Sequence, residues 1–279
     1  MPPIAELFDL RGRVAIVTGA CGLLGREHCD VLAEAGANIV VADLSPEANR
    51  KMAEDLARTR KTKALPVQVD VSERESVQRM AAQVVNEFGR IDILVNNAAL
   101  TVKGGSDGVD DYFAPFEEYP LAMWERALRV ALTGTFLCSQ AAGGQMVKQN
   151  RGVIINLCSI YGLVAPDQRI YANARSPYDR AVTFNTPASY SATKGSILAL
   201  TRYLATYWAD KNIRVNALTP GGVLDQHDPE FVKSYSSRTP LGRMADRAEF
   251  RGAILFLASD ASSYMTGANL VVDGGWTAW

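Results

Sequence analysis

The sequence is poor in the residues that build disulfide frameworks and metal sites. It has four cysteines and two histidines among 279 residues. No C-x-x-C pair occurs, and no cysteine and histidine cluster at metal-ligand spacing, so we expect no bound metal. Cysteines without a pairing pattern are typical of reduced thiols, which predicts a cytoplasmic location. These residues are Cys21, Cys29, Cys138, Cys158, His28 and His227.

Neither sign of charge dominates, since 29 Lys and Arg residues face 30 Asp and Glu residues. This balance argues against a nucleic-acid-binding protein, because such proteins typically carry an excess of basic residues. No run of about 18 apolar residues occurs, which argues against a membrane span. The first residues lack the basic and apolar regions of a secretory signal, so we expect none. Hydrophobic residues make up 48% of the chain, enough for a globular core.

Short apolar runs alternate with segments of helical character. Ser45 and Pro46 favour a helix start, as an N-cap and a first-turn proline, and the spacing from Ser72 to Glu75 is that of a capping box. Gly36 is expected to end a helix that follows the first run. The expected strands are residues 13–18, 38–43, 65–70, 91–96, 153–158, 213–218 and 269–272.

The expected strands are almost continuously apolar, which is typical of a parallel sheet covered by helices on both faces. The regular alternation predicts an α/β fold with a doubly wound, Rossmann-type sheet of about seven strands, in a single domain over residues 1–279. Two segments, 101–118 and 164–187, show no periodicity. Both follow strand C-termini, where such sheets bind ligands, so we expect substrate loops there.

A glycine turn follows the first expected strand. In Thr18–Gly25 the glycines recur at every third position, which permits a tight turn, close approach of a pyrophosphate and close packing of the next helix. Asp43 ends the second expected strand, where a carboxylate can accept hydrogen bonds from both ribose hydroxyls of a dinucleotide. It would repel a 2′-phosphate. The turn therefore predicts NAD rather than NADP.

Tyr190 and Lys194 are four residues apart in an expected helix, so they share one face. A nearby ammonium lowers the pKa of a phenol and suits it to acid–base work. The spacing alone has limited specificity, because Tyr207 and Lys211 repeat it. We interpret that second pair as structural, with Lys211 bonding the last helix carbonyls. Ser159 follows the fifth strand at the C-terminal edge of the sheet, where it is either a capping serine or part of the same site.

Together these features resemble the short-chain dehydrogenase/reductase family, over roughly residues 8–276. The ordered motifs include Asn96-Asn97-Ala98-Ala99, Tyr190-x-x-x-Lys194 and Val272-Asp273-Gly274-Gly275. The resemblance implies hydride transfer between an alcohol carbon and a nicotinamide cofactor. Ser159, Tyr190 and Lys194 would be catalytic, with Tyr190 as the acid/base. It implies that the cofactor contacts Gly19, Gly22, Leu23, Leu24, Asp43, Leu44, Asp70, Val71, Asn97, Ala98, Tyr190, Lys194, Pro220, Gly221 and Val223.

The chain departs from the classical branch of the family in several places. The glycine spacing T-G-x-x-G-x-x-G resembles that of the extended branch, although 279 residues leave no room for the extra substrate region of that branch. Ala99 stands where the family's Asn-Asn-Ala-Gly motif has glycine. Ala131 stands where the family usually has an asparagine that supports a proton-relay water. A methyl group cannot hold that water, so a slower or rerouted relay is expected.

Ser159 and Tyr190 are 31 residues apart, farther than is usual in the family, so 164–187 resembles an insertion over the substrate cleft. Our hypothesis is that Arg169, Arg175 or Arg180 in this insertion binds an anionic substrate group. The alternative is that they are solvated loop charges.

The final residues, VVDGGWTAW, and the FAPFEEYP stretch from Phe113 are similar to those of bacterial dehydrogenases of surface-sugar pathways, which favours a sugar-like or polyol-like substrate.

The sequence thus predicts a NAD-dependent oxidoreductase acting on a secondary alcohol or ketone of a small polar molecule. Two alternatives stay open: a lyase or epimerase that retains its cofactor, and a weakly active NAD-binding protein, because of Ala131. The family resemblance also implies a homodimer or homotetramer built on the helices after strands four and five. The apolar tail with Trp276 and Trp279 would suit a subunit interface.

Overall fold

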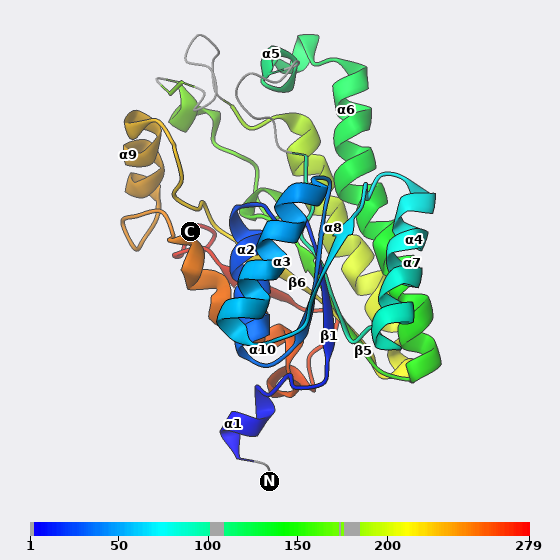
Figure 1. Cartoon of the computed structure of the whole chain (residues 1–279). Coiled ribbons are helices and arrows are strands. Elements are labelled where there is room, and N and C mark those ends of the chain that lie inside the picture. Colours follow the sequence, from blue (N-terminus) through cyan, green and yellow to red (C-terminus); the bar gives the residue numbers. More distant parts are fainter. Residues whose placement is uncertain (1–2, 101–108, 173, 176–184) are drawn as a thin grey trace.

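The computed structural model describes residues 3–100, 109–172, 174–175 and 185–279. Its centre is a parallel seven-stranded sheet in the order β3-β2-β1-β4-β5-β6-β7, which confirms the predicted doubly wound fold (Figure 1). The strands are β1 (Val14–Thr18), β2 (Asn38–Asp43), β3 (Ala64–Gln68), β4 (Ile93–Asn96), β5 (Gly152–Leu157), β6 (Ile213–Pro220) and β7 (Asn269–Val272).

Helices cover both faces of the sheet. One face is covered by α2, α3 and α10, and the other by α4, α7 and α8 (Figure 1). No helix of the described residues is long and apolar enough to span a membrane. The α-helices are α1 (Ile4–Leu7), α2 (Leu23–Glu34), α3 (Pro46–Arg60), α4 (Arg74–Phe88), α5 (Val109–Tyr112), α6 (Leu121–Leu128), α7 (Gly134–Gln149), α8 (Ala188–Tyr207), α9 (Pro229–Arg238) and α10 (Arg251–Ala258).

The strands are apolar because neither face of the sheet meets water. Every residue of β1 and of β5 is buried. Side chains that alternate along a strand enter two separate cores, one beneath α2, α3 and α10 and the other beneath α4, α7 and α8. The parallel register brings the C-terminal ends of the central strands to one edge of the sheet, and this edge positions the site.

Of three predicted helix-end signals, those at Ser45 and Gly36 are confirmed and the one at Ser72 is wrong. Ser45 Oγ accepts a hydrogen bond from Ala48 N at 3.3 Å, and Gly36 has a positive φ of 97°, as predicted for a cap and a helix end. The capping box at Ser72 was wrong: Ser72 Oγ donates to Asp70 Oδ1 at 2.7 Å, and Glu73 precedes α4 without a side-chain cap.

Several predicted strand boundaries shift by one or two residues, and two of these shifts have an identifiable cause. The fourth strand begins at Ile93 rather than residue 91, because the Asp92 carboxylate, and not a backbone carbonyl, accepts from Val14 N at 2.8 Å. The third ends at Gln68 rather than residue 70, where Asp70 begins a turn toward Ser72.

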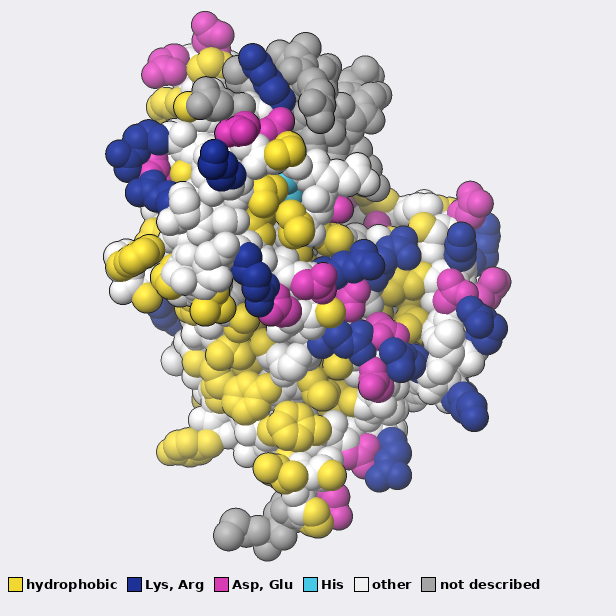
Figure 2. Space-filling view, turned by 90° about the vertical axis from the view of Figure 1, so that its left-hand side faces the viewer, with side chains coloured by type: hydrophobic (Ala, Val, Ile, Leu, Met, Phe, Trp, Pro, Cys, Tyr) yellow, Lys and Arg dark blue, Asp and Glu magenta, His cyan; other side chains and the backbone are white. Residues whose placement is uncertain are grey.

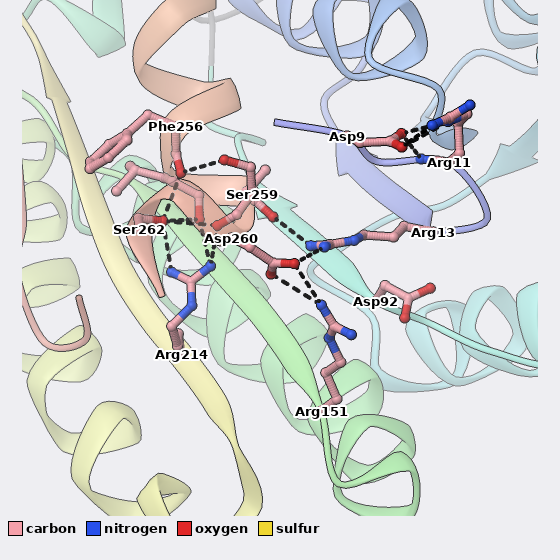
Figure 3. Close-up of polar contacts among 12 residues, drawn as sticks. Asp9, Arg11, Arg13, Asp92, Arg151, Arg214, Phe256, Ser259, Asp260 and Ser262 are labelled. Atoms are coloured by element: carbon pink, nitrogen blue, oxygen red, sulfur yellow. Dashed lines mark hydrogen bonds and ion pairs between the residues drawn. The ribbon is translucent and has the colours of Figure 1, made fainter. Parts of the chain in front are cut away.

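An ionic cluster lies at the opposite edge of the sheet (Figure 3). The Arg214 guanidinium donates to the carbonyl oxygens of Leu257, in the last turn of α10, and of Ser259, just past its end, at 3.2 and 2.9 Å. Burial lowers the pKa of Arg214 to about 10, so it stays charged at neutral pH. Arg13 and Arg151 share Asp260 nearby, at 2.5 and 3.0 Å. Arg214 therefore anchors α10 to β6.

We predict that Arg214→Ala lowers the free energy of unfolding by about 2–4 kcal/mol, because the carbonyl oxygens of Leu257 and Ser259 lose a charged donor that the single Ser262 hydroxyl cannot replace at both. The matched control is Arg151→Ala, whose side chain is 55% exposed. Its loss should cost less than about 1 kcal/mol. Urea denaturation followed by circular dichroism measures both, and equal losses would contradict the account.

Candidate active site

A cavity of about 370 Å³ opens at the C-terminal edge of the sheet. Ser159, Tyr190 and the Pro220–Val223 segment line it together, although they lie far apart in sequence. The structure thus brings two predicted catalytic residues beside the predicted nicotinamide-contacting segment. We call this the central cavity.

The glycine turn between β1 and α2 is shaped by close backbone contacts. A Cβ at Gly19, whose φ is +63°, would lie 2.9 Å from Ala98 Cα, and one at Gly25 would lie 2.2 Å from Gly19 O. Gly22 precedes α2 without a side-chain cap. The first-turn N–H groups of α2, from Leu23 and Leu24, can therefore bind phosphate oxygens.

Asn97 ties this turn to the end of β4. Its Nδ2 donates to the carbonyl oxygens of Thr18 and Gly19, at 3.0 and 2.9 Å. The Thr18 hydroxyl in turn accepts from the backbone N–H groups of Asn97 and Ala98, at 3.1 and 3.2 Å. The family resemblance predicts that Asn97 and Ala98 line the cofactor cleft. In the structure, Asn97 joins the loop after β4 to the glycine turn after β1.

Asp43 lies at the end of β2, facing the glycine turn. One carboxylate oxygen accepts from Cys21 N at 2.9 Å, and the other from Leu44 N at 2.7 Å. Leu44 is itself exposed. These bonds fix an anionic acceptor beside the turn, where it can accept from ribose hydroxyls and would repel a phosphate.

Asp70 and Val71 follow β3 toward the same edge. Asp70 Oδ1 accepts from the Ser72 backbone N at 2.9 Å, so its turn is closed by its own side chain. Val71 is buried, and a Cβ at Gly134 would lie 2.8 Å from its Cγ2. A side chain at Gly134 would thus displace Val71, which we expect to contact adenine.

Tyr190 and Lys194 lie in the first two turns of α8, and Ser159 follows β5. Lys194 is only 6% exposed, its Nζ donates to Leu157 O at 2.8 Å, and it lies 5.8 Å from the centre of the Tyr190 ring. Ser159 forms a hydrogen bond with Tyr190 and also accepts from Tyr161 N at 3.3 Å. The capping interpretation of Ser159 is therefore confirmed, whereas its catalytic role stays a prediction.

The pKa of Tyr190 beside Lys194 differs from the value that the sequence leads us to expect. Burial raises the pKa of Tyr190, and the hydrogen bond from Ser159 offsets this only in part. Burial also lowers the pKa of Lys194 to about 8. The expected lowering of the phenol pKa is therefore wrong for this arrangement, because the loss of solvation raises this pKa more than the Ser159 hydrogen bond lowers it. The phenol keeps its proton at neutral pH.

Ala131 lies in a π-helical segment, Arg129–Thr133, between α6 and α7. Its methyl group is buried, and its carbonyl oxygen accepts from Thr135 Oγ1 at 2.7 Å. The altered proton relay proposed from the sequence stays a prediction.

The second Tyr–Lys pair has no link to the cavity. Tyr207 is exposed at the end of α8. Lys211 Nζ donates to Asp210 Oδ2 at 2.7 Å, so the expected bonds to helix carbonyls are wrong. Trp276, expected at a subunit interface, is also placed differently: it is buried and stacks on Tyr235, with ring centres 4.2 Å apart.

Of the three arginines expected near the substrate, two are described. The Arg169 side chain is 83% exposed and pairs with Asp167, which also pairs with Arg238. Arg175 is exposed. Neither is among the residues that line the central cavity. Arg180 lies outside the described residues.

Sequence reasoning missed the aromatic wall of the cavity. Tyr161, Tyr171, His227, Phe231 and Tyr235 all line it. Tyr161 and Tyr171 come from loops, and no sequence pattern joins them to the other three. His227, Phe231 and Tyr235 recur at every fourth residue along α9 and the segment before it, and this helical spacing was the available signal.

We predict a pH signature for the buried Lys194 ammonium. Its pKa is about 8 in the folded chain, against 10.5 for an ordinary lysine, so the unfolded chain binds more protons between these values. Stability should therefore rise with pH through this window. Relative to Lys194→Met, the wild-type free energy of unfolding should increase by about 2–3 kcal/mol from pH 7 to pH 10. A difference that stays flat in denaturation curves would contradict this burial.

Two family models match the chain. One, described as short chain dehydrogenase, matches residues 13–175, and the other, described as Enoyl-(Acyl carrier protein) reductase, matches residues 176–277. Trans-4-hydroxycyclohexanecarboxylate dehydrogenase of Sinomonas cyclohexanicum is 37% identical over 271 residues, which cover 95% of this chain and 93% of that protein.

Solved structures of dehydrogenases are also similar to this chain over nearly its whole length. A gluconate 5-dehydrogenase of Burkholderia cenocepacia, in complex with NADP and tartrate, has a TM-score of 0.85 and 32% identity, covering 99% of this chain and 100% of that one. A NAD+-bound xylitol dehydrogenase has a TM-score of 0.80 and 31% identity, covering 95% of this chain and 99% of that one.

Proposed function

The chain belongs to the short-chain dehydrogenase/reductase family, and on this premise we propose that it is a NAD-dependent dehydrogenase of a secondary alcohol or ketone with Tyr190 as acid/base. Membership makes it an oxidoreductase that uses a nicotinamide cofactor. The observation that supports the finer proposal is the meeting of Ser159 and Tyr190 in the central cavity, with Lys194 one turn further along α8.

The described residues suit a dinucleotide. The uncapped start of α2 offers N–H groups for its phosphates, Gly19 and Gly25 keep the turn narrow, and Asp43 offers acceptors for a ribose. When bound, the nicotinamide supplies hydride acceptance or donation. The preference for NAD rests on Asp43, because the 2′-phosphate of NADP beside this carboxylate would meet like charge.

The protein's own residues would manage the proton. Tyr190 Oη holds a proton at neutral pH and can donate it to a substrate carbonyl oxygen, or take it back from an alcohol. Ser159 would hold the same oxygen by a hydrogen bond. Lys194, with a pKa of about 8, is mostly cationic at pH 7, and its bond to Leu157 O fixes its position below the tyrosine ring.

The relatives favour a small hydroxylated substrate. Their printed names refer to a hydroxycyclohexanecarboxylate, to gluconate and to xylitol. These support the sugar-like or polyol-like class for this chain. The idea that an arginine of segment 164–187 binds an anionic group stays a prediction, without support from the positions of Arg169 and Arg175.

We further infer a homo-oligomer in the cytoplasm. Phe136 on α7 and Tyr203 on α8 are large, exposed and apolar, as an interface on these helices requires. Figure 2 shows another gathering of apolar side chains on the face that bears α10. Trp279 is 82% exposed and remains available to an interface, unlike Trp276. The cytoplasmic location rests on the reduced thiols that the cysteine pattern of the sequence predicts.

We predict that Tyr190→Phe lowers kcat at least about a hundredfold, because the proton donor is lost. Cofactor binding, measured by fluorescence titration with NADH, should change little, since the ring remains. The matched control is Tyr207→Phe, which has the same spacing to a lysine but is exposed outside the cavity. It should keep full activity. Turnover that survives in Tyr190→Phe would refute the acid/base assignment.

A second prediction concerns cofactor choice. Wild type should prefer NAD, and Asp43→Ser should reduce the ratio of kcat/KM for NAD over NADP by about tenfold, since it removes a ribose acceptor and a like charge. Glu47→Gln removes the charge of an exposed side chain in the first turn of α3 and should leave the ratio unchanged. Wild-type preference for NADP would overturn the proposal.

A further inference from the structure

One residue in the buried face of α3 is polar. The side chains that α3 buries are Asn49, Met52, Ala53 and Leu56, at the spacing of a single helix face. The last three belong to the apolar core beneath α2, α3 and α10, and Asn49 is completely buried in the same row. Asparagine is a weak helix former, and a buried amide costs free energy unless its hydrogen bonds are made. The partners of this amide therefore indicate why it is there.

Both ends of the Asn49 amide have partners. Its Nδ2 donates to Asp43 O at 2.9 Å and to Val67 O at 2.8 Å, which joins α3 to β2 and β3 near their C-terminal ends. Its Oδ1 accepts from Cys21 Sγ at 3.3 Å, in the glycine turn. The two carbonyl acceptors fix the orientation of the amide, because a reversed amide would set its oxygen against them. Asn49 thus contacts three segments that meet at the site edge of the sheet.

These bonds form a closed hydrogen-bond triangle at Asp43. Cys21 N donates to Asp43 Oδ2 at 2.9 Å, the Cys21 thiol donates to Asn49, and the Asn49 amide donates to the Asp43 carbonyl oxygen. Each of the three residues therefore bonds both others, and we call this set the Asp43 triangle. A network whose members are all satisfied is more rigid than a single bond. The triangle thus limits movement of the Asp43 carboxylate relative to the glycine turn.

A role in the fold alone does not account for the bond to Cys21. Ser45 already caps α3, and the ladder from Ile39 to Asp43 pairs β2 with β3 without help from Asn49. The bond from the thiol instead reaches the turn whose N–H groups we expect to bind the cofactor phosphates. The triangle therefore connects that turn to the carboxylate expected to bind the ribose.

We propose that Asn49 is a positioning residue for the cofactor, and that it acts by holding the glycine turn against Asp43 through Cys21. The inference rests on the proposed NAD-dependent function and adds a residue that is too deeply buried to touch the cofactor. Groups that bind the ribose and the phosphates of one nucleotide must stand at a fixed separation. A displacement of about 1 Å in such an arrangement can cost up to about a hundredfold.

The variant Cys21→Ala tests the thiol bond, because it leaves both carbonyl bonds of Asn49 in place. The Kd for NADH, measured by fluorescence titration without substrate, should rise about tenfold. The kcat at saturating NAD should stay within about threefold, since neither Cys21 nor Asn49 is among the described residues that line the central cavity. Cys21→Ser, whose hydroxyl can donate to Asn49 Oδ1, should recover most of the affinity.

Asn49→Leu removes the amide at similar volume and should raise the Kd for NADH at least as much. It should also lower stability, because Asp43 O and Val67 O lose a donor. If this variant does not fold, the comparison of Cys21→Ala with Cys21→Ser decides. The matched control is Thr62→Val. Thr62 Oγ1 donates to Ala37 O at 2.5 Å, just before β3 and β2 begin, so its loss should lower stability and leave the Kd unchanged.

A double-mutant cycle shows whether the effect passes through Asp43. In an Asp43→Ser background, Cys21→Ala should change the Kd for NADH less than about twofold, because the carboxylate that the triangle holds is gone. The same tenfold loss in both backgrounds would overturn the proposal. So would a Cys21→Ser variant as weak as Cys21→Ala, or a Thr62→Val variant that loses as much affinity.

Binding without substrate separates this inference from the proposed function. Tight NADH binding by wild type and weak binding by Cys21→Ala, with no alcohol oxidised, would support the triangle and overturn the dehydrogenase. Alcohol oxidation with equal NADH affinity in wild type, Cys21→Ala and Asn49→Leu would overturn the triangle alone. A wild type that prefers NADPH, or that binds neither cofactor, would overturn both, since Asp43 would then hold no NAD ribose.

Discussion

The hydrogen bond from Lys194 Nζ to Leu157 O, at 2.8 Å, joins the helix that bears the predicted acid/base to the strand that precedes Ser159. The two partners are 37 residues apart in sequence, with the whole of segment 164–187 between them. This bond satisfies an ammonium that is almost fully buried, and it fixes the first turns of α8 against β5. The position of Tyr190 beside Ser159, and hence the central cavity, depends on this join. An unsatisfied ammonium at that depth would be strongly destabilising.

The edge of the sheet supplies the other half of the site. Parallel strands end together, so the loops after β1, β2, β4 and β6 meet without any long-range signal in the sequence. Asn97 then reinforces the glycine turn through Thr18 and Gly19. The opposite edge is held by arginines and carbonyl groups around Arg214. The contacts around Arg214 thus stabilise the edge opposite the site. The site edge presents the polar groups that remain available to ligands.

Much of this could be predicted, because strands buried on both faces have continuous apolar runs and because the glycine turn and the Tyr190–Lys194 spacing are local patterns. The aromatic wall could be predicted only in part: His227 and Phe231 are four residues apart, as on one helix face, whereas Tyr171 meets them only in three dimensions. The pKa of Tyr190 was predicted in the wrong direction because a sequence shows the neighbouring charge but not the loss of solvation. Trp276 was expected at a subunit interface because nothing in the sequence of the tail indicates that its ring stacks on Tyr235.

The central claim is hydride transfer from a secondary alcohol carbon within the cavity lined by Ser159 and Tyr190. Isotope tracing tests it most directly. An accepted alcohol, deuterated at its carbinol carbon, is incubated with the holoenzyme and NAD, and the reduced cofactor is examined by mass spectrometry. The account predicts that the deuterium appears in NADH in step with ketone formation. Product formed without net NADH, as from an epimerase or lyase, or NADH without deuterium, would contradict it.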